Sequence, residues 1–181
     1  KTSRLESGQL AFDFGLVDAG AKLREVTTRL PSDPARPLRL DLPDHPLPVW
    51  ADADRLAEGV ENLVTNAVKY SPDGGEIRLF ARREHESVVV GVEDRGLGLA
   101  ASDRDRLFRP FSRVRSARTA DIEGTGLGLY ICDRIVRAHG GRFAVERALG
   151  RGSTFAFSPP LFGSAEKSRA LAEARRVAED A

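Results

Sequence analysis

Several features are scarce in this chain of 181 residues, and each absence excludes a class of protein. The single cysteine, Cys132, cannot form a disulfide within the chain, so a reducing compartment is expected. No apolar run approaches the roughly 20 residues that cross a bilayer, and no secretory signal is present. The 28 basic and 27 acidic residues nearly cancel, which argues against a general nucleic-acid binder. Methionine is absent and the chain begins at Lys1, so we expect a cytoplasmic piece of a longer protein.

Hydrophobic residues make up 41% of the chain, enough for a core, and their spacing predicts alternating helices and strands. Helical spacing predicts helices at about 19–30, 53–70 and 127–138, with a further one near 164–179. Alternation predicts strands at about 10–15, 38–42, 76–83, 87–93, 142–147 and 153–158. The fold class that follows is an α/β (α+β) two-layer sandwich, with a mixed, largely antiparallel sheet and helices on one face.

The helix expected at 53–70 carries a polar stripe on one side. Asn62, Asn66 and Lys69 or Tyr70 recur at helical spacing, so they share a face distinct from the leucine and valine face. An amide oxygen is a neutral ligand for Mg²⁺, the lysine adds charge for a phosphate, and the tyrosine could lie against a base. A solvated polar face is the alternative, and from this motif alone the two are about even.

Asp94 follows the strand expected at 87–93 and precedes Gly96 and Gly98. A carboxylate at this place can accept a hydrogen bond from an exocyclic amine, such as that of adenine. The glycines allow positive φ and close approach of a base. A simple turn is the alternative.

Residues 124–128, Gly-Thr-Gly-Leu-Gly, open the helix expected at 127–138. Backbone N–H groups at a helix N-terminus form an anion site. The stretch is not a dinucleotide-binding motif, because no βαβ unit surrounds it, and it is not a P-loop, because no Gly-Lys-Ser/Thr follows. A flexible hinge is the alternative. The irregular stretch before it contains Phe108 and Phe111, which could anchor a mobile lid or belong to the core.

In this order and spacing, the motifs resemble the N, G1, F and G2 boxes of the ATP-binding catalytic domain of bacterial sensor histidine kinases, in the GHKL (Bergerat-fold) superfamily. Flanking sequence at 52–56, 69–72, 139–141 and 150–155 adds to the likeness. The resemblance implies three parts. Residues 1–9 would end a dimerisation hairpin, 10–160 would be the catalytic domain with a lid at about 98–124, and 161–181 would be a C-terminal tail with a helix.

The resemblance also implies roles for matching positions. Asn66 would ligate Mg²⁺, Asn62 would lie near the phosphates, and Lys69 would contact phosphate. No catalytic residue is implied beyond these three, which position ATP and Mg²⁺. Asp94 would bind the adenine amine. The full set of expected ATP contacts is Asn62, Asn66, Lys69, Tyr70, Asp94, Gly96, Gly98, Phe108, Gly124, Thr125, Gly126, Leu127, Gly128, Leu129, Ser153 and Thr154.

Asn62 discriminates within the superfamily. ATPases and serine kinases of this superfamily carry a glutamate base at that position, and an amide cannot act as a base. We therefore expect a phosphodonor that gives the γ-phosphate of ATP to a histidine on a separate domain, for later transfer to a response-regulator aspartate. His45, His85 and His139 fit no acceptor motif, so we expect them to be structural or solvated.

The partners implied are the parent protein's own dimerisation and histidine phosphotransfer domain and the receiver domain of a response regulator, with no nucleic acid. The chain by itself is expected to be monomeric, and a homodimeric parent anchored in the inner membrane is compatible with it. A stand-alone GHKL ATPase or serine kinase, or a degenerate nucleotide-sensing module, remains the alternative.

Overall fold

The computed structural model describes residues 12–85, 87–98, 100, 103, 106–112, 119, 122, 124–148 and 152–159. The segment expected at 1–9, the helix expected near 164–179 and much of the expected lid lie outside the described residues.

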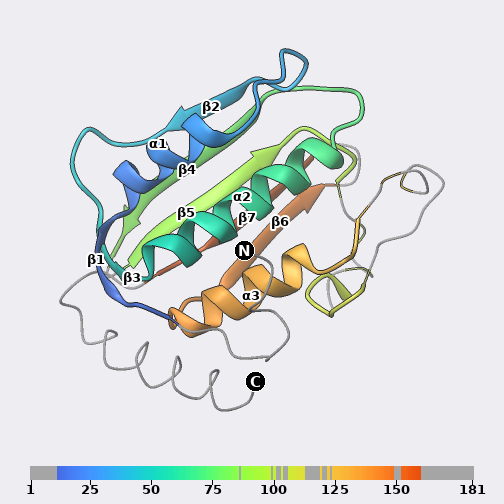
Figure 1. Cartoon of the computed structure of the whole chain (residues 1–181). Helices are drawn as coiled ribbons and strands as arrows, with labels where there is room; N and C mark the ends of the chain where they lie inside the picture. Colours follow the sequence, from blue (N-terminus) through green and yellow to red (C-terminus); the bar gives the residue numbers. More distant parts are fainter. Residues whose placement is uncertain are drawn as a thin grey trace.

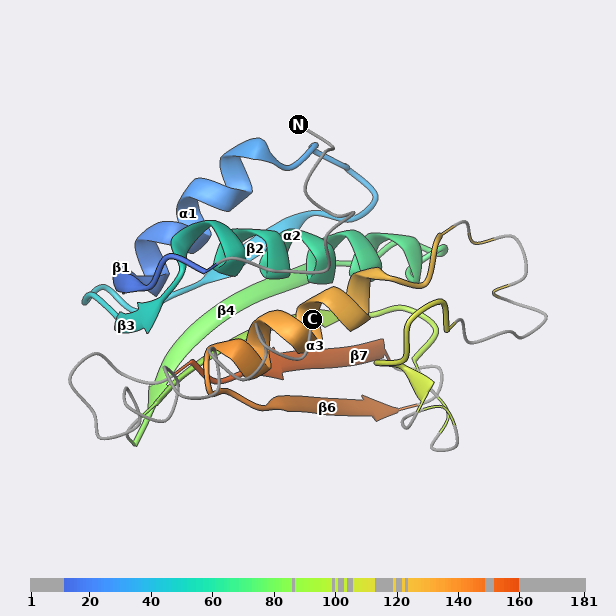
Figure 2. The ribbon, with the colours of Figure 1, turned by 60° about the horizontal axis from the view of Figure 1, so that its bottom comes forward.

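The described part of the chain forms two layers, a sheet and a set of helices on one of its faces (Figures 1 and 2). The sheet has five strands in the order β2 (Leu38–Asp41), β4 (Ile77–Glu84), β5 (Ser87–Asp94), β7 (Gly152–Phe157) and β6 (Phe143–Ala148). Only β2 and β4 run parallel, and the other neighbours are antiparallel. The helices are α1 (Ala19–Arg29), α2 (Ala53–Lys69) and α3 (Gly128–Ala138). The predicted sandwich is confirmed.

Aspartate side chains cap the first two helices. The side chain of Asp52 accepts bonds from the N–H groups of Asp54 and Arg55, each at 3.0 Å. Asp18 accepts from the N–H of Gly20 at 3.0 Å. These bonds satisfy N–H groups that have no partner within the helix. The caps fix where α1 and α2 begin, and the apolar residues of α2 form its buried face.

The N-terminal strand differs from the prediction. It was expected at about 10–15, but strand β1 spans Gly15–Asp18, and residues 12–14 are not in a strand. The partner of β1 is β3 (Pro48–Ala51), an antiparallel strand that the proline-rich sequence concealed. Pro48 occupies the first position of that strand, where a missing N–H is tolerated. Pairing with β3 therefore sets the register of β1, which alternation along the chain could not predict.

Cys132 lies in α3, where it faces α2, and is 1% exposed. Its Sγ donates to the backbone oxygen of Gly59 at 3.4 Å. Burial raises the pKa of the thiol to about 12. The thiolate needed for reactivity is therefore suppressed, and the residue acts as a small buried apolar group.

His139 is also buried, at 2% exposure, and joins three segments. Its Nε2 accepts from the N–H of Asp52 at 3.0 Å, so Nδ1 carries the proton and donates to the oxygen of Ile135 at 2.7 Å. The rings of Phe12 and Phe14 lie edge-on to the imidazole, with centroids 6.0 and 5.0 Å away. The predicted structural role of this histidine is confirmed, because the ring is buried and both of its nitrogens bond the backbone of the domain.

This burial predicts a pH-dependent stability. Desolvation lowers the pKa of His139 from its ordinary 6.5, so the folded state holds the ring neutral where the unfolded chain takes up a proton. The contribution of His139 to the free energy of unfolding is expected to be complete above about pH 6.5 and to fall as the pH drops below that value. Urea titrations between pH 7.5 and 5.5 measure the slope.

Two glutamine variants isolate this contribution. His139→Gln keeps an acceptor for Asp52 but does not titrate, so it should flatten the slope. His45→Gln changes an exposed histidine and should retain the slope of the original protein. An unchanged slope in His139→Gln would contradict the assignment.

Candidate nucleotide-binding site

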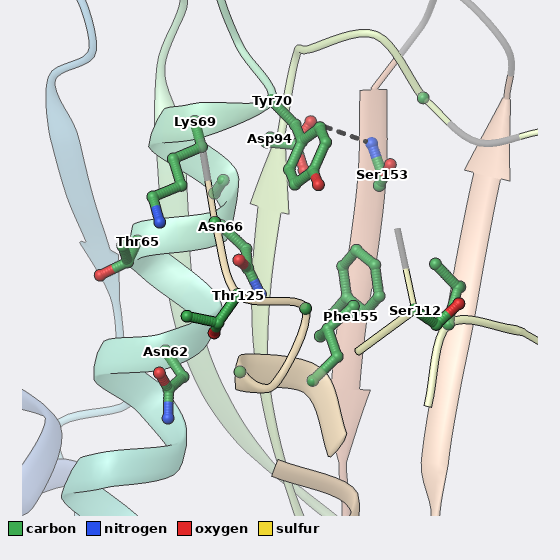
Figure 3. Close-up of a pocket in the computed structure, with 17 residues that line it drawn as sticks. Asn62, Thr65, Asn66, Lys69, Tyr70, Asp94, Ser112, Thr125, Ser153 and Phe155 are labelled. Atoms are coloured by element: carbon green, nitrogen blue, oxygen red, sulfur yellow. Dashed lines mark hydrogen bonds between the residues drawn. The ribbon is translucent and has the colours of Figure 1, made fainter. Parts of the chain in front are cut away.

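A cavity lies between α2, the ends of β5 and β7 and the start of α3 (Figure 3). Twelve of the residues expected at a nucleotide site line it: Asn62, Asn66, Lys69, Tyr70, Asp94, Gly98, Gly124, Thr125, Gly126, Gly128, Leu129 and Ser153. The chain segments that carry them are distant in sequence, and the fold brings them to one place. Figure 3 shows Asn62 and Thr125 near one end of the cavity and Asp94 and Ser153 near the other.

The polar stripe of α2 faces the glycine-rich segment 124–128. A Cβ built on Gly128 would lie 3.5 Å from Oδ1 of Asn62 and 3.8 Å from Nδ2 of Asn66. A Cβ on Gly124 would lie 3.9 Å from Nζ of Lys69. The two glycines therefore leave the amide and ammonium groups open toward the cavity instead of covering them with side chains.

The start of α3 contributes bare backbone donors to the same end. Its N-cap residue is Leu127, whose aliphatic side chain makes no capping bond. The helix itself begins with Gly128, which lines the cavity. Uncapped N–H groups at a helix N-terminus attract anions. With Lys69 nearby, this end of the cavity can hold phosphates.

Asp94 occupies the opposite end and is 5% exposed. Its Oδ1 accepts from the N–H of Gly96 at 2.8 Å and from the N–H of Ser153 at 3.3 Å. Burial raises the pKa of the carboxyl, against the opposing effect of these two bonds. Because Oδ2 accepts neither bond, it is available to a donor in the cavity, which suits an exocyclic amine.

Gly96 does not line the cavity but shapes it. A Cβ on this residue would lie only 2.0 Å from the backbone oxygen of Tyr70. The same oxygen accepts from the N–H of Leu97 at 2.9 Å. Only glycine permits this approach, so Gly96 locks the loop after β5 against the end of α2.

Phe108, Leu127 and Thr154, expected to contact ATP, also lie outside the cavity lining. The ring of Phe108 packs against Phe143, with centroids 5.0 Å apart, so it anchors its segment to the core. Thr154 follows Ser153 in β7 and pairs with Glu93, and successive strand residues point to opposite faces. It therefore points away from the cavity that Ser153 faces.

The structure adds five lining residues that were not expected: Thr65, Ala67, Leu107, Ser112 and Phe155. Phe155 could have been found, because it stands two residues after Ser153 in the same strand and so shares its face. Thr65 likewise lies one turn from Asn62 on α2. Leu107 and Ser112 come from an irregular segment, where no periodicity places a side chain.

A mixed sheet covered on one face by helices, with a cavity between an asparagine-bearing helix, a buried strand-end carboxylate and a glycine-rich helix start, defines an ATP-binding domain of the Bergerat type. The model of the family described as histidine kinase-, DNA gyrase B- and HSP90-like ATPases matches residues 51–163. The chain belongs to this family, whose nucleotide is ATP.

Individual relatives narrow the comparison to histidine kinases. The sensor histidine kinase WalK of Bacillus subtilis (strain 168) is 38% identical over 122 residues, which cover 66% of this chain and 20% of WalK. The nucleotide-free catalytic domain of histidine kinase ThkA superposes with a TM-score of 0.71 at 26% identity, covering 82% of this chain and 96% of that one. Full-length ShkA in complex with AMPPNP superposes with a TM-score of 0.69 at 29% sequence identity, and the match covers 87% of this chain and 33% of ShkA. The resemblance read from the motifs is confirmed.

This chain thus spans a fifth of the length of WalK. Within the described residues, no helix is long and apolar enough to cross a membrane.

Proposed function

We propose that this domain binds Mg·ATP and presents the γ-phosphate to a histidine on a separate domain of its parent protein. The observation that carries the proposal is the arrangement of the cavity. Asp94 stands at one end, Asn62 and Asn66 face the bare start of α3 at the other, and Nζ of Lys69 lies beside Gly124 in the glycine-rich segment. An adenine at Asp94 would direct its phosphates toward that second end.

Asn66 would hold Mg²⁺ through its amide oxygen, with phosphates and waters as the other ligands. Mg²⁺ in phosphate-transfer sites is commonly held by few protein groups. Once bound, the metal would neutralise charge on the phosphates. Asn62, Lys69 and the N–H groups of α3 would fix the direction of the γ-phosphate, so the contribution of this chain is positioning.

Transfer to a histidine is favoured over hydrolysis by the absence of a base. Among the described residues that line the cavity, Asp94 is the sole acid, and it lies at the end proposed for adenine, away from the γ-phosphate. Glu58, one turn before Asn62, is paired with Arg55 at 2.6 Å. No described carboxylate of the lining is therefore placed to activate water against the γ-phosphate.

The acceptor and later partners lie outside this chain. The acceptor histidine would belong to the parent's dimerisation and phosphotransfer domain, and the receiver domain of a response regulator would take the phosphate next. The names of two relatives support the donor role, since WalK is a sensor histidine kinase and ShkA was solved with AMPPNP. The parent would be a homodimer whose catalytic domain lies in the cytoplasm.

The proposal predicts magnesium-dependent binding of an ATP analogue. Titration of the domain with AMPPNP by calorimetry should give a markedly lower Kd with Mg²⁺ than with EDTA. Asn66→Ala should remove most of that difference, because loss of a direct ligand should cost at least the roughly tenfold that outer-shell changes cost. Glu61→Ala, on the same helix but not in the cavity lining, should retain the difference.

Two results would count against the proposal. Failure of the domain to bind AMPPNP with Mg²⁺ would favour a degenerate module. Steady ATP hydrolysis by the domain alone, lost in Asn66→Ala, would favour a stand-alone ATPase.

A further inference from the structure

Arg36 lies outside the cavity, in the segment between α1 and β2, and reaches the loop that follows α2. Its Nε donates to the backbone oxygen of Ser71 at 2.7 Å, and Nη2 donates to that of Pro72 at 3.3 Å. Its Nη1 donates to Oδ2 of Asp33 at 2.7 Å. The guanidinium thus bridges two segments separated by 35 residues, and the side chain is 21% exposed.

Backbone bonds join the same two segments. The N–H of Gly75 donates to the oxygen of Ala35 at 2.9 Å, and the N–H of Ile77 donates to the oxygen of Pro37 at 3.0 Å. These bonds fix the far side of the loop. Within the loop, the oxygen of Ser71 also accepts from the N–H of Gly74 at 3.0 Å, and Arg36 ties that oxygen and the oxygen of Pro72 across to the segment before β2. The carbonyls next to the C-terminus of α2 are held by a cation, which suits the negative end of the helix dipole.

The loop held by Arg36 continues directly into the cavity wall. Tyr70, the residue before Ser71, lines the cavity and is the C-cap of α2. Its backbone oxygen accepts from Leu97, beside Gly98, which also lines the cavity. A displacement of Ser71 would therefore move Tyr70 and the loop after Asp94 together. That loop carries the N–H of Gly96, which bonds Oδ1 of Asp94.

We propose that Arg36 is a positioning residue for the base end of the nucleotide site, acting through the carbonyls of Ser71 and Pro72 on Tyr70 and on residues 96–98. This inference rests on the proposed function, since it assumes that adenine binds beside Asp94. It assigns no contact between Arg36 and the nucleotide. The hydrogen bond that Arg36 gives Asp33 also lowers the pKa of that carboxyl, so Asp33 is ionised near neutral pH and can hold the guanidinium in place.

Arg36→Ala tests the inference against a matched control. Arg55→Ala removes an arginine in a similar i, i+3 ion pair, which is 31% exposed and has no bond to the loop after α2. The Kd values of AMPPNP, ADP and AMP are measured for both variants and for the original protein. Arg36→Ala should raise all three by a similar factor, about threefold to tenfold, because the base is common to them. Arg55→Ala should leave all three unchanged.

A second readout separates positioning from general stability. Amide hydrogen exchange at Leu97, whose N–H bonds Tyr70, should accelerate in Arg36→Ala while exchange at Val90 in β5 keeps its rate. If Arg36→Ala folds poorly, Arg36→Lys serves instead, because a lysine keeps the charge but cannot bridge both carbonyls and Asp33. It should show the same pattern with a smaller loss.

The outcomes are distinguishable. If the original protein does not bind AMPPNP, the proposed function itself is overturned. If the original protein binds AMPPNP and Arg36→Ala binds the three nucleotides with the same affinities, only the inference about Arg36 is overturned. A loss that grows with the number of phosphates would place the effect at the other end of the cavity and would also overturn it.

Discussion

Replacing Asp94 with asparagine is expected to weaken binding of adenine nucleotides by about tenfold to a hundredfold while the fold is retained. Oδ1 accepts two backbone N–H bonds, from Gly96 and Ser153. An asparagine has one oxygen, and if it serves those donors, its NH₂ faces the adenine amine. If the amide turns over, the NH₂ faces the backbone N–H groups instead. Either arrangement sets donor against donor, which costs about 1–3 kcal/mol.

Calorimetry with AMPPNP and GMPPNP measures this effect. The original protein should favour the adenine analogue, and Asp94→Asn should lose most of that preference. The midpoint of thermal unfolding without nucleotide should change little, because the side chain keeps its shape. An Asp94→Asn variant with the original Kd for AMPPNP would mean that Asp94 is only a turn residue.

The same residue gives binding a pH dependence. Burial raises the pKa of Asp94 in the protein without nucleotide. The ionised carboxylate can accept an amine on Oδ2 directly, whereas the protonated carboxyl must first lose its proton. Binding therefore releases a proton from the protonated fraction, and affinity should fall as the pH is lowered toward that raised pKa. Titration of the nucleotide phosphates affects the original protein and Asp94→Asn equally. At each pH, the ratio of the Kd of Asp94→Asn to the Kd of the original protein therefore isolates the contribution of the carboxyl group.

Local features of the site could be predicted from the sequence because short-range geometry fixes them. The stripe of Asn62, Asn66 and Lys69 follows from helical spacing, and Asp52 and Asp18 cap helices within a few residues of themselves. The position of Asp94 follows from the end of a strand. At these positions, periodicity and capping chemistry determine where a side chain lies.

Features that depend on tertiary approach could not be predicted. Nothing near Arg36 in the chain indicates that it bonds Ser71, and nothing near Gly96 indicates that it packs on the oxygen of Tyr70. Strand β3 was concealed because its first residue is a proline and its partner precedes it across α1. In each case, the deciding contact joins segments that are far apart in the chain. Local sequence patterns do not indicate that such segments meet in the fold.

Two glycine-to-alanine changes should have opposite effects on stability. In α2, a Cβ on Gly59 would meet only Cγ2 of Ile135, at 3.9 Å, which is an ordinary contact. Glycine within a helix costs about 0.5–1 kcal/mol relative to alanine, so Gly59→Ala should stabilise the domain by about that amount. It also leaves the backbone oxygen that bonds Cys132 in place.

Gly96→Ala should instead destabilise the domain by about 3 kcal/mol and abolish measurable binding of AMPPNP. The new methyl group would lie 2.0 Å from the oxygen of Tyr70 and 2.7 Å from Oγ of Ser71. The first of these neighbours is backbone, so relief requires the loop after Asp94 to separate from the end of α2. That separation breaks the bond from Leu97 to Tyr70 and withdraws the Gly96 N–H from Asp94. Urea unfolding with calorimetry checks both effects, and binding that survived a large loss of stability would show that the two elements need not touch for the site to work.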